Sequence, residues 1–352
     1  MLKIQDNVEN SNLIDGEIIK YINPCANTRL SEMSGLDVQD LLSFIEEYYL
    51  NLRRNLGFSS DITFGLELEF EKSNNDAIKN ELKELFLSKD KEWIFVEDDS
   101  LFSGGEINSP ILTDNEEAWN DLLKVCLAVE PHASIFKNSG GHIHVGTQVL
   151  GDKKESWLNF IKLWSIYENI IYRFSYGEYL TARPCISRYA KPMNTEFMEY
   201  YLNNNKDDEK LEDLLIKLAI DKNQAVNFKN VLIDKIGNFD IKNTIEFRCP
   251  NGTLNPIVWQ NNVNLFVNLL KYSKSASFNE DIVEKRYLLN SDNFTDIDSY
   301  DEIYLDQAFE LCDMIFNNNL DKLYFLKQYL KSFKVSNDRE NFSKTRCLLV
   351  KE

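Results

Sequence analysis

Every second residue between Ile62 and Phe70 is apolar, and this strict alternation constrains the fold more than any other feature of the sequence. The positions between the apolar residues include Glu67 and Glu69, and Glu71 follows in the same phase. Successive side chains of a β-strand point to opposite faces of its sheet. The segment therefore predicts a strand with one apolar and one acidic face, in an antiparallel sheet whose polar face carries Glu67 and Glu69.

The rest of the chain alternates between segments with a helical spacing of apolar residues and short strand-like segments. Residues 37–56 show a clear helical period, and Gly57 follows as a stop signal. Asp114 is placed to cap a helix that runs to about Val129. Further helices are expected at 76–87, 155–174, 195–203, 208–220, 258–272, 300–316 and 320–333, a short element at 17–22, and strands at 93–96, 106–111, 139–147 and 243–249.

Three parts of the chain follow from these patterns. Residues 1–57 form an N-terminal extension and a helix, and residues 58–273 form the core. Residues 274–300 are polar with little apolar periodicity, so they are the expected linker. Together with the helices that follow, they make residues 274–352 a linker with C-terminal helices packing on the core.

The charge balance narrows the choice of partners. Lys and Arg total 39 against 57 Asp and Glu, for a net charge of -18, which opposes binding to extended nucleic acid or an anionic membrane. No apolar run is long enough to span a bilayer, and the first residues lack the pattern of a secretory signal. The six cysteines show no Cys-x-x-Cys spacing, which argues against structural zinc. We expect a cytoplasmic protein.

Two acidic clusters are candidates for a metal site. Glu67 and Glu69 lie side by side on one strand face, where carboxylates repel unless water or a shared cation separates them. Ordinary surface acids would give the same pattern. A second cluster, residues 97–99, is joined to Glu106 through the doublet Gly104-Gly105, which predicts a tight turn toward the earlier acids. A charged hairpin loop is the alternative.

Two of the three histidines, His142 and His144, share one face of the strand expected at 139–147. The preceding glycine doublet lets a ligand approach the backbone closely. One of the two histidines can equally be a hydrogen-bonded core residue. We expect His142 to contact metal or phosphate, His144 to support it, and His132 to be unrelated to the site.

Positive charge gathers at two places along the chain. Glu246 and Arg248 share a strand face, where they are either a simple ion pair or, beside a metal cluster, a place where the guanidinium binds phosphate or carboxylate. Arg183, Arg188 and Lys191 would add positive charge for an anionic transition state, or form a basic surface loop.

The motifs occur in a fixed order along the chain. They are Gly65-x-Glu67-x-Glu69, Asp98-x-Ser100-Leu101 leading to Gly105-Glu106 and Ser109-Pro110, Gly141-His142-x-His144-Val145-Gly146, Arg188-Tyr189, and Glu246-Phe247-Arg248 with Gly252-Thr253. This ordered set, over about residues 62–270, resembles the putative amidoligase family of the glutamine synthetase and glutamate-cysteine ligase superfamily. The resemblance implies an α+β fold, with a glutamine synthetase-like catalytic domain at 58–273 whose curved antiparallel β-sheet has helices packed on its outer face.

The resemblance also implies roles for single residues. Arg248 matches the superfamily's substrate- or phosphate-binding arginine, Arg188 matches the arginine after the histidine motif, and Asp98 is preferred over Asp99 for its spacing to Glu106. The expected metal ligands are Glu67, Glu69, Asp98, Glu106, His142 and Glu246. The expected catalytic residues are Arg248, Arg188 and Glu246, and the expected cofactor-binding residues are His142, Arg183, Arg188, Lys191 and Arg248.

The chemistry implied is ATP-dependent joining of a carboxylate to an amine through an acyl phosphate, with Mg²⁺ or Mn²⁺ held by the carboxylates. The substrate would be an amino acid, a peptide or a cell-wall-type molecule with a free carboxylate, and an oligomer is compatible with the family. The small N-terminal domain of glutamine synthetases has no counterpart in residues 1–57, so the amine side is unassigned. A guanidino-type phosphotransferase of the same fold and a binding protein without catalysis are the alternatives.

Overall fold

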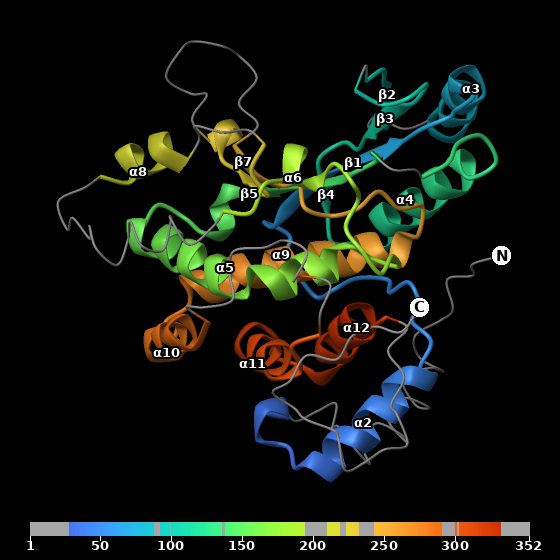
Figure 1. The fold of residues 1–352 in the computed structure, drawn as a ribbon. Coiled ribbons are helices and arrows are strands. Elements are labelled where there is room, and N and C mark those ends of the chain that lie inside the picture. Colours follow the sequence, from blue (N-terminus) through green and yellow to red (C-terminus); the bar gives the residue numbers. More distant parts are fainter. Residues whose placement is uncertain are drawn as a thin grey trace.

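The computed structural model describes residues 28–87, 92–98, 100–135, 138–193, 210–218, 223–231, 243–290, 300 and 303–331. These residues form an α+β fold with one open antiparallel sheet of seven strands and about ten α-helices, as Figure 1 shows. The expected α+β class and the antiparallel sheet are confirmed.

The sheet has β1 (Thr63–Phe70) near its middle, and the strand order is β2-β3-β1-β5-β7-β6, with β4 paired to β1. Every strand pairing is antiparallel. The other strands are β2 (Ile94–Val96), β3 (Gly105–Asn108), β4 (Leu112–Thr113), β5 (Gly141–Gly146), β6 (Val226–Asn227) and β7 (Thr244–Phe247).

Four of the helices lie in two layers on one side of the sheet (Figure 1). In Figure 1, α5 (Lys154–Ser175) and α9 (Pro256–Lys274) run beneath the sheet, and α11 (Leu305–Ile315) and α12 (Asn319–Leu330) lie below them. The remaining helices are α2 (Gly35–Glu47), α3 (Asn75–Phe86), α4 (Glu116–Val129), α6 (Ile186–Tyr189), α8 (Leu211–Leu218) and α10 (Glu280–Asn290), with short 3-10 turns η1 (Leu30–Glu32), η2 (Thr147–Val149) and η3 (Lys229–Val231).

The apolar face of the sheet packs on α5, α9 and α4. Phe247 of β7 stacks on Phe266 of α9 with ring centroids 4.1 Å apart, and it also touches Trp164 of α5. At the other end, Phe64 of β1 stacks on Trp119 of α4 at 5.2 Å. Because the apolar side chains of alternate positions are used in this core, the intervening polar side chains are left on the opposite face.

The helix expected at 37–56 is wrong beyond Glu47, since Tyr48 is already extended. Tertiary contacts hold the following residues outside a helix. Leu52 is buried with Ile257 of α9, and Arg53 forms an ion pair with Asp321 of α12 at 2.6 Å. The apolar spacing of this segment reflects contacts with two different partners rather than one helical face.

The linker expected at 274–300 is also wrong in part, because Glu280–Asn290 form α10. The apolar period is weak because Val283 is nearly the only apolar residue of this helix that is fully buried. Instead, Arg286 anchors the helix by ion pairs with Asp306 at 3.1 Å and Glu310 at 2.9 Å. The sequence pattern therefore missed a helix held by charges.

Two smaller expectations need correction. Asn115, rather than Asp114, caps α4, and the Asp114 carboxylate instead accepts hydrogen bonds from backbone groups of the segment before β1. The strand expected at 106–111 ends at Asn108, because Pro110 has no N–H to donate to a neighbouring strand.

The expected elements at 17–22 and 195–203 lie outside the described residues. None of the described helices is both long and apolar enough to cross a bilayer.

Candidate metal and substrate site

The polar face of the sheet gathers side chains from separate parts of the chain. In the strand register, Glu67 lies opposite His142 on β5, Glu69 lies opposite Glu106 on β3, and His144 lies opposite Glu246 on β7. Directly paired residues of neighbouring antiparallel strands point to the same face. The expectation that these acids and histidines share one face of a sheet is confirmed.

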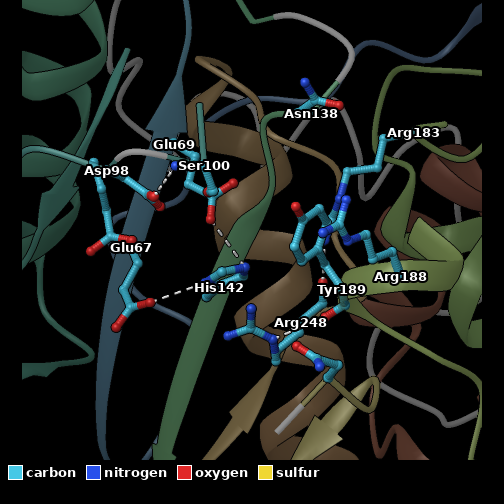
Figure 2. A pocket seen from close by; sticks show the side chains of 12 residues that line it. Glu67, Glu69, Asp98, Ser100, Asn138, His142, Arg183, Arg188, Tyr189 and Arg248 are labelled. Atoms are coloured by element: carbon cyan, nitrogen blue, oxygen red, sulfur yellow. Dashed lines mark hydrogen bonds and ion pairs between the residues drawn. The ribbon is translucent and has the colours of Figure 1, made fainter. Parts of the chain in front are cut away.

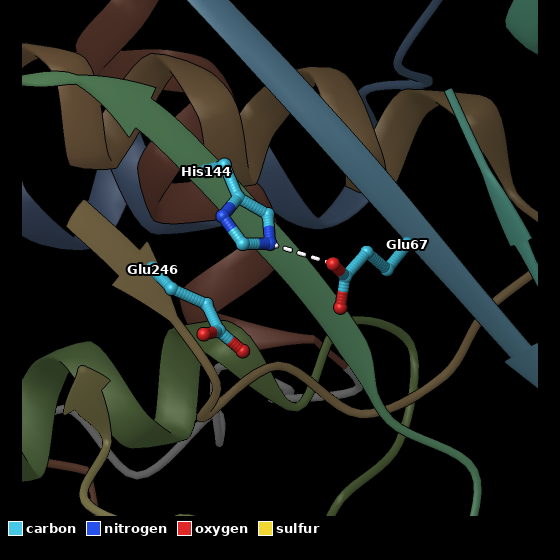
Figure 3. A group of neighbouring side chains, drawn as sticks. All are labelled: Glu67, His144 and Glu246. Atoms are coloured by element: carbon cyan, nitrogen blue, oxygen red, sulfur yellow. Dashed lines mark hydrogen bonds and ion pairs between the residues drawn. The ribbon is translucent and has the colours of Figure 1, made fainter. Parts of the chain in front are cut away.

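Glu67 lies at the centre of this cluster and contacts both histidines. Its Oε2 is 3.0 Å from Nδ1 of His142, and its Oε1 is 2.8 Å from Nε2 of His144. The other ring nitrogen of His144 lies 3.1 Å from Oγ1 of Thr244, so that ring is held on two sides. Figure 3 shows the His144 ring directed at Glu67, with Glu246 on the neighbouring strand.

Glu69 and Glu246 are held at opposite ends of the cluster. Glu69 accepts a hydrogen bond from the backbone N–H of Gly140 at 2.5 Å, and His142 Nε2 lies 3.3 Å from its other oxygen. Glu246 forms an ion pair with Arg248 and accepts a hydrogen bond from Nδ2 of Asn227 at 2.7 Å. These fixed contacts restrict where each carboxylate can point.

Gly140 is a point of close approach in this arrangement. A Cβ at this position would lie 3.1 Å from Oε2 of Glu69 and 3.1 Å from the guanidinium of Arg183. A side chain here would be crowded by both charged groups, which would have to move apart by a few tenths of an ångström. The sequence pattern predicted that a ligand approaches the backbone at the glycine doublet; in the structure, two side chains of the protein itself, those of Glu69 and Arg183, lie close to Gly140.

The crowding of acids changes their proton affinity. Burial opposes ionisation of Glu67, but hydrogen bonds from His142 and His144 outweigh it and hold the pKa of Glu67 well below its usual range. Glu106 also has favourable neighbours, the charge of His142 and a hydrogen bond with Asn108, but they do not outweigh the opposing effects. Burial, together with the negative charge of Glu67, raises the pKa of Glu106 to about 7. A cation bound between the acids would relieve this repulsion.

Three groups of side chains in the described structure can each hold a metal ion, since the ligand atoms within a group lie within 4.8 Å of one another. Glu67 belongs to two of the groups, and Glu106 also belongs to two. Two of the groups combine two carboxylates with one imidazole, and the third has carboxylates alone, a set of donors that suits Mg²⁺ or Mn²⁺. The groups are Glu67, His144 and Glu246; Glu67, Glu106 and His142; and Glu69, Asp98 and Glu106.

The acids line one wall of a cavity of about 490 Å³, here called cavity A. Figure 2 shows that the opposite wall carries Arg183, Arg188, Tyr189 and Arg248. The cavity therefore separates negative from positive charge across a short gap. Its lining residues are Glu67, Glu69, Asp98, Ser100, Glu106, Asn138, His142, Arg183, Arg188, Tyr189, Asn223 and Arg248.

Two of the arginines, Arg183 and Arg248, donate hydrogen bonds to main-chain oxygens. Arg183 is buried, and its guanidinium donates to the carbonyl oxygens of Pro250 and Arg248. Burial lowers the pKa of Arg183 below its ordinary value. Arg248 donates from Nε to the carbonyl oxygen of Tyr189 at 3.1 Å, in addition to its ion pair with Glu246. Donors fixed in this way can receive an anion without rearrangement.

A second cavity of about 690 Å³, cavity B, lies on the other side of Glu67. Glu67 lines both cavities, and His144 lines cavity B alone. No lysine or arginine is among the described residues that line cavity B. They are Thr63, Phe64, Gly65, Leu66, Glu67, Asn108, Ser109, Pro110, Ile111, His144, Gly146, Gln148, Asn243 and Thr244.

The structure brings together nearly all of the residues predicted for the site. Glu246 is part of one metal group although it does not line cavity A. Lys191 is the exception, since its side chain is exposed, it lines neither cavity, and its backbone pairs with Asn223 and Ala225. Asp99 lies outside the described residues, and His132 contacts Glu81 of α3 instead.

Sequence reasoning missed three asparagines of the site. Asn138 and Asn223 line cavity A, and Asn227 supports Glu246. Asn138 directly precedes the Ser-Gly-Gly-His segment, so its position was a usable signal. Asn223 and Asn227 lie in a segment without a motif, and only the strand pairing of β6 with β7 brings Asn227 to Glu246.

An open antiparallel sheet whose polar face combines clustered carboxylates, two histidines and facing arginines defines a class of protein that can bind metal ions beside an anionic ligand. The chain belongs to a family within this class. The family model described as putative amidoligase enzyme matches residues 32–270, so the resemblance is confirmed and its match begins before the expected core. Membership implies a carbon–nitrogen ligase activity. A search of curated proteins found no match.

Proposed function

We propose that the protein is an ATP-dependent ligase that joins a carboxylate to an amine. One observation carries the proposal: a wall of clustered acids faces a wall of arginines across cavity A, in a chain of the amidoligase family. Acids with bound Mg²⁺ suit a triphosphate, and arginines suit a carboxylate or a transferred phosphoryl group. A ligase that activates a carboxylate with ATP needs the metal-binding acids and the arginines at one place.

The acid wall would hold Mg²⁺, with Mn²⁺ as a substitute. Bound metal supplies positive charge that neutralises the phosphates of ATP and the phosphoryl group in transfer. The ligands we propose are Glu67, Glu69, Asp98, Glu106, His142 and Glu246. His144 holds Glu67 in place and, within its own group, is a further candidate ligand.

The two cavities suggest how the substrates divide. Cavity B is lined by neutral and apolar residues apart from Glu67 and His144, which suits the uncharged nucleoside of ATP. The phosphates would then extend past Glu67 toward cavity A. The carboxylate substrate would enter cavity A, where Arg183, Arg188 and Arg248 can orient it. In this proposal the three arginines bind the carboxylate and the phosphoryl group in transfer, whereas the sequence predicts that they bind the cofactor.

The reaction we propose has two steps. A carboxylate oxygen attacks the γ-phosphorus of ATP, the bond to ADP breaks, and an acyl phosphate forms. The amine nitrogen then attacks the acyl carbon, the carbon–oxygen bond to phosphate breaks, and an amide or isopeptide bond results. Arg248 and Arg188 would stabilise negative charge in both steps, and Glu246 would fix the orientation of Arg248 through their ion pair.

We propose an amino acid, a peptide or a cell-wall-type molecule as the carboxylate substrate, in the cytoplasm. The net charge of -18 is consistent with partners other than nucleic acid and membrane. The experiment that tests the activity incubates the protein with Mg²⁺, ATP and pooled amino acids and peptides. Formation of ADP together with an acceptor mass that has gained an amine is the expected result.

Two other outcomes of that experiment would overturn the proposal. Phosphorylated guanidine compounds without any amide would identify a phosphotransferase. No nucleotide turnover with any pool, in protein that binds Mg²⁺ and ATP, would identify a binding protein. A Glu67→Gln variant is the matched control, because it keeps the size of the side chain and removes the charge that both cavities share.

A further inference from the structure

Glu71 follows Glu67 and Glu69 in the same phase of the strand sequence, yet it belongs to none of the three metal groups. Its side chain is fully buried. Oε1 accepts hydrogen bonds from the backbone N–H of Phe102 at 3.0 Å and from Nδ2 of Asn138 at 3.1 Å. Oε2 has no hydrogen-bond partner in the described part of the chain. This carboxylate is therefore committed to two loops rather than to a ligand.

The first of these loops includes Phe102 and follows Asp98, one of the four acids of cavity A. The loop, residues 100–104, ends where β3 begins at Gly105, and Glu106 follows. The loop lies directly on the end of β1, because a Cβ at Gly104 would come within 2.0 Å of the carbonyl oxygen of Phe70. Backbone bonds from Lys72 and Ser73 to this loop, at 3.1 and 2.9 Å, extend the contact.

The second loop connects Glu71 to the arginine wall. The Asn138 side chain donates to Glu71 from Nδ2, while its Oδ1 accepts a hydrogen bond from the thiol of Cys185 at 2.9 Å. Cys185 lies between Arg183 and Arg188, immediately before α6. The contacts from Glu71 through Asn138 to Cys185 thus connect the end of β1 to the segment that carries Arg183 and Arg188, and Asn138 itself lines cavity A.

We propose that Glu71 is a positioning residue. It sets the spacing between the loop at residues 100–104, which lies between Asp98 and Glu106, and the segment that carries Arg183 and Arg188. A charged acceptor makes stronger hydrogen bonds than a neutral one, and burial strengthens them further. Both loops are therefore pinned to the rigid strand β1 rather than to each other. The consequence for catalysis rests on the proposed ligase function, but the geometric claim does not.

The thiol of Cys185 provides a test that needs no turnover. Cys185 is half-buried, whereas Cys126, Cys249 and Cys312 are buried. Loss of the Glu71 contact should free Asn138 and expose the Cys185 thiol. We expect alkylation of Cys185 by iodoacetamide, followed by peptide mass spectrometry in the native protein, to be about tenfold faster in Glu71→Ala than in the wild type.

Two variants make the comparison specific. Glu71→Gln keeps an acceptor oxygen for Phe102 and Asn138, so its alkylation rate should stay within about twofold of the wild type. Asp114→Ala is the matched control, because Asp114 also anchors backbone N–H groups and lines neither cavity. Asp114→Ala should lower the stability of the protein without changing the alkylation rate of Cys185. An equal increase in the alkylation rate of Cys185 in Asp114→Ala would overturn the role of Glu71. No increase in that rate in folded Glu71→Ala would overturn it as well.

Asn138→Ala keeps the test open if Glu71→Ala does not fold, since it removes the middle of the same series of contacts. Unchanged alkylation of Cys185 in Asn138→Ala would also overturn the proposal. In turnover assays, Glu71→Ala should raise the Mg²⁺ concentration for half-maximal activity about tenfold, with rescue by Glu71→Gln. Faster alkylation in a protein without any ligase activity would support the role of Glu71 and refute the proposed function alone.

Discussion

Replacing Glu106 by Gln should make the metal-free protein more stable at neutral and alkaline pH. Glu106 lies opposite Glu69 in the sheet, and its pKa is raised from 4.5 to about 7. The folded protein therefore holds this proton more tightly than the unfolded chain does. The stability gained from protonation is complete below pH 4.5 and is lost as the pH rises through about 7.

The size of the effect follows from the pKa shift. One pKa unit corresponds to about 1.4 kcal/mol, so the wild type should lose about 3 kcal/mol of unfolding free energy from this group across the interval. Gln has nearly the same shape and no charge, so Glu106→Gln lacks this loss. Groups that do not interact with Glu106 contribute equally to both proteins and cancel in the difference.

The assay is urea unfolding of both proteins in EDTA, from about pH 5 to about pH 8.5. The stability difference should grow by about 3 kcal/mol in favour of the variant. Saturating Mg²⁺ should then stabilise the wild type at high pH and the variant much less, because the ion neutralises the ionised carboxylate. A difference that stays constant with pH, or equal stabilisation of both proteins by Mg²⁺, would refute the reasoning.

Three further predictions concern other parts of the molecule. Glu67→Ala should reduce ADP formation about a thousandfold and also lower the unfolding midpoint, because His142 and His144 lose the carboxylate that they contact; folded Glu67→Ala with ADP formation close to the wild type would contradict the metal role. Gly140→Ala should push Arg183 and Glu69 apart and lower kcat/KM ten- to a hundredfold, and unchanged steady-state kinetics would contradict this. Asp313→Ala should cost about 3 kcal/mol in urea unfolding at neutral pH, because buried Lys322 loses its carboxylate partner. Hydrogen bonds hold the pKa of Asp313 below its usual value against the effect of burial. The stability of the wild type should therefore fall as acid protonates Asp313, whereas that of Asp313→Ala should not. Parallel pH profiles of the two proteins would contradict this role of Asp313.

The polar face of the sheet could be predicted because it depends on a local rule. The alternation around Glu67 and Glu69 places them on one face whatever the rest of the chain does, and the same rule applies to His142 with His144. The pairing of Glu69 with Glu106 is a matter of register between strands that are distant in sequence. Only the ordered motifs of the family suggested that these strands meet.

Other features depend on contacts that no local pattern encodes. Residues 48–56 continue the apolar spacing of α2, but Arg53 is held by Asp321 and the chain is not helical there. The helix α10 shows the opposite case, in which ion pairs of Arg286 replace an apolar face. Lys191 lies close to Arg188 in sequence, yet the chain turns after α6 and its side chain is exposed outside cavity A.

The measurement that tests the central claim most directly follows oxygen from the carboxylate. Pooled amino acids and peptides carrying ¹⁸O in their carboxyl groups are incubated with the protein, Mg²⁺, ATP and an amine, and the released phosphate is analysed by mass spectrometry. If the protein joins carboxylate to amine through an acyl phosphate, the phosphate carries one ¹⁸O atom for each amide formed, and Glu67→Gln produces none. Phosphate released without ¹⁸O would contradict the account.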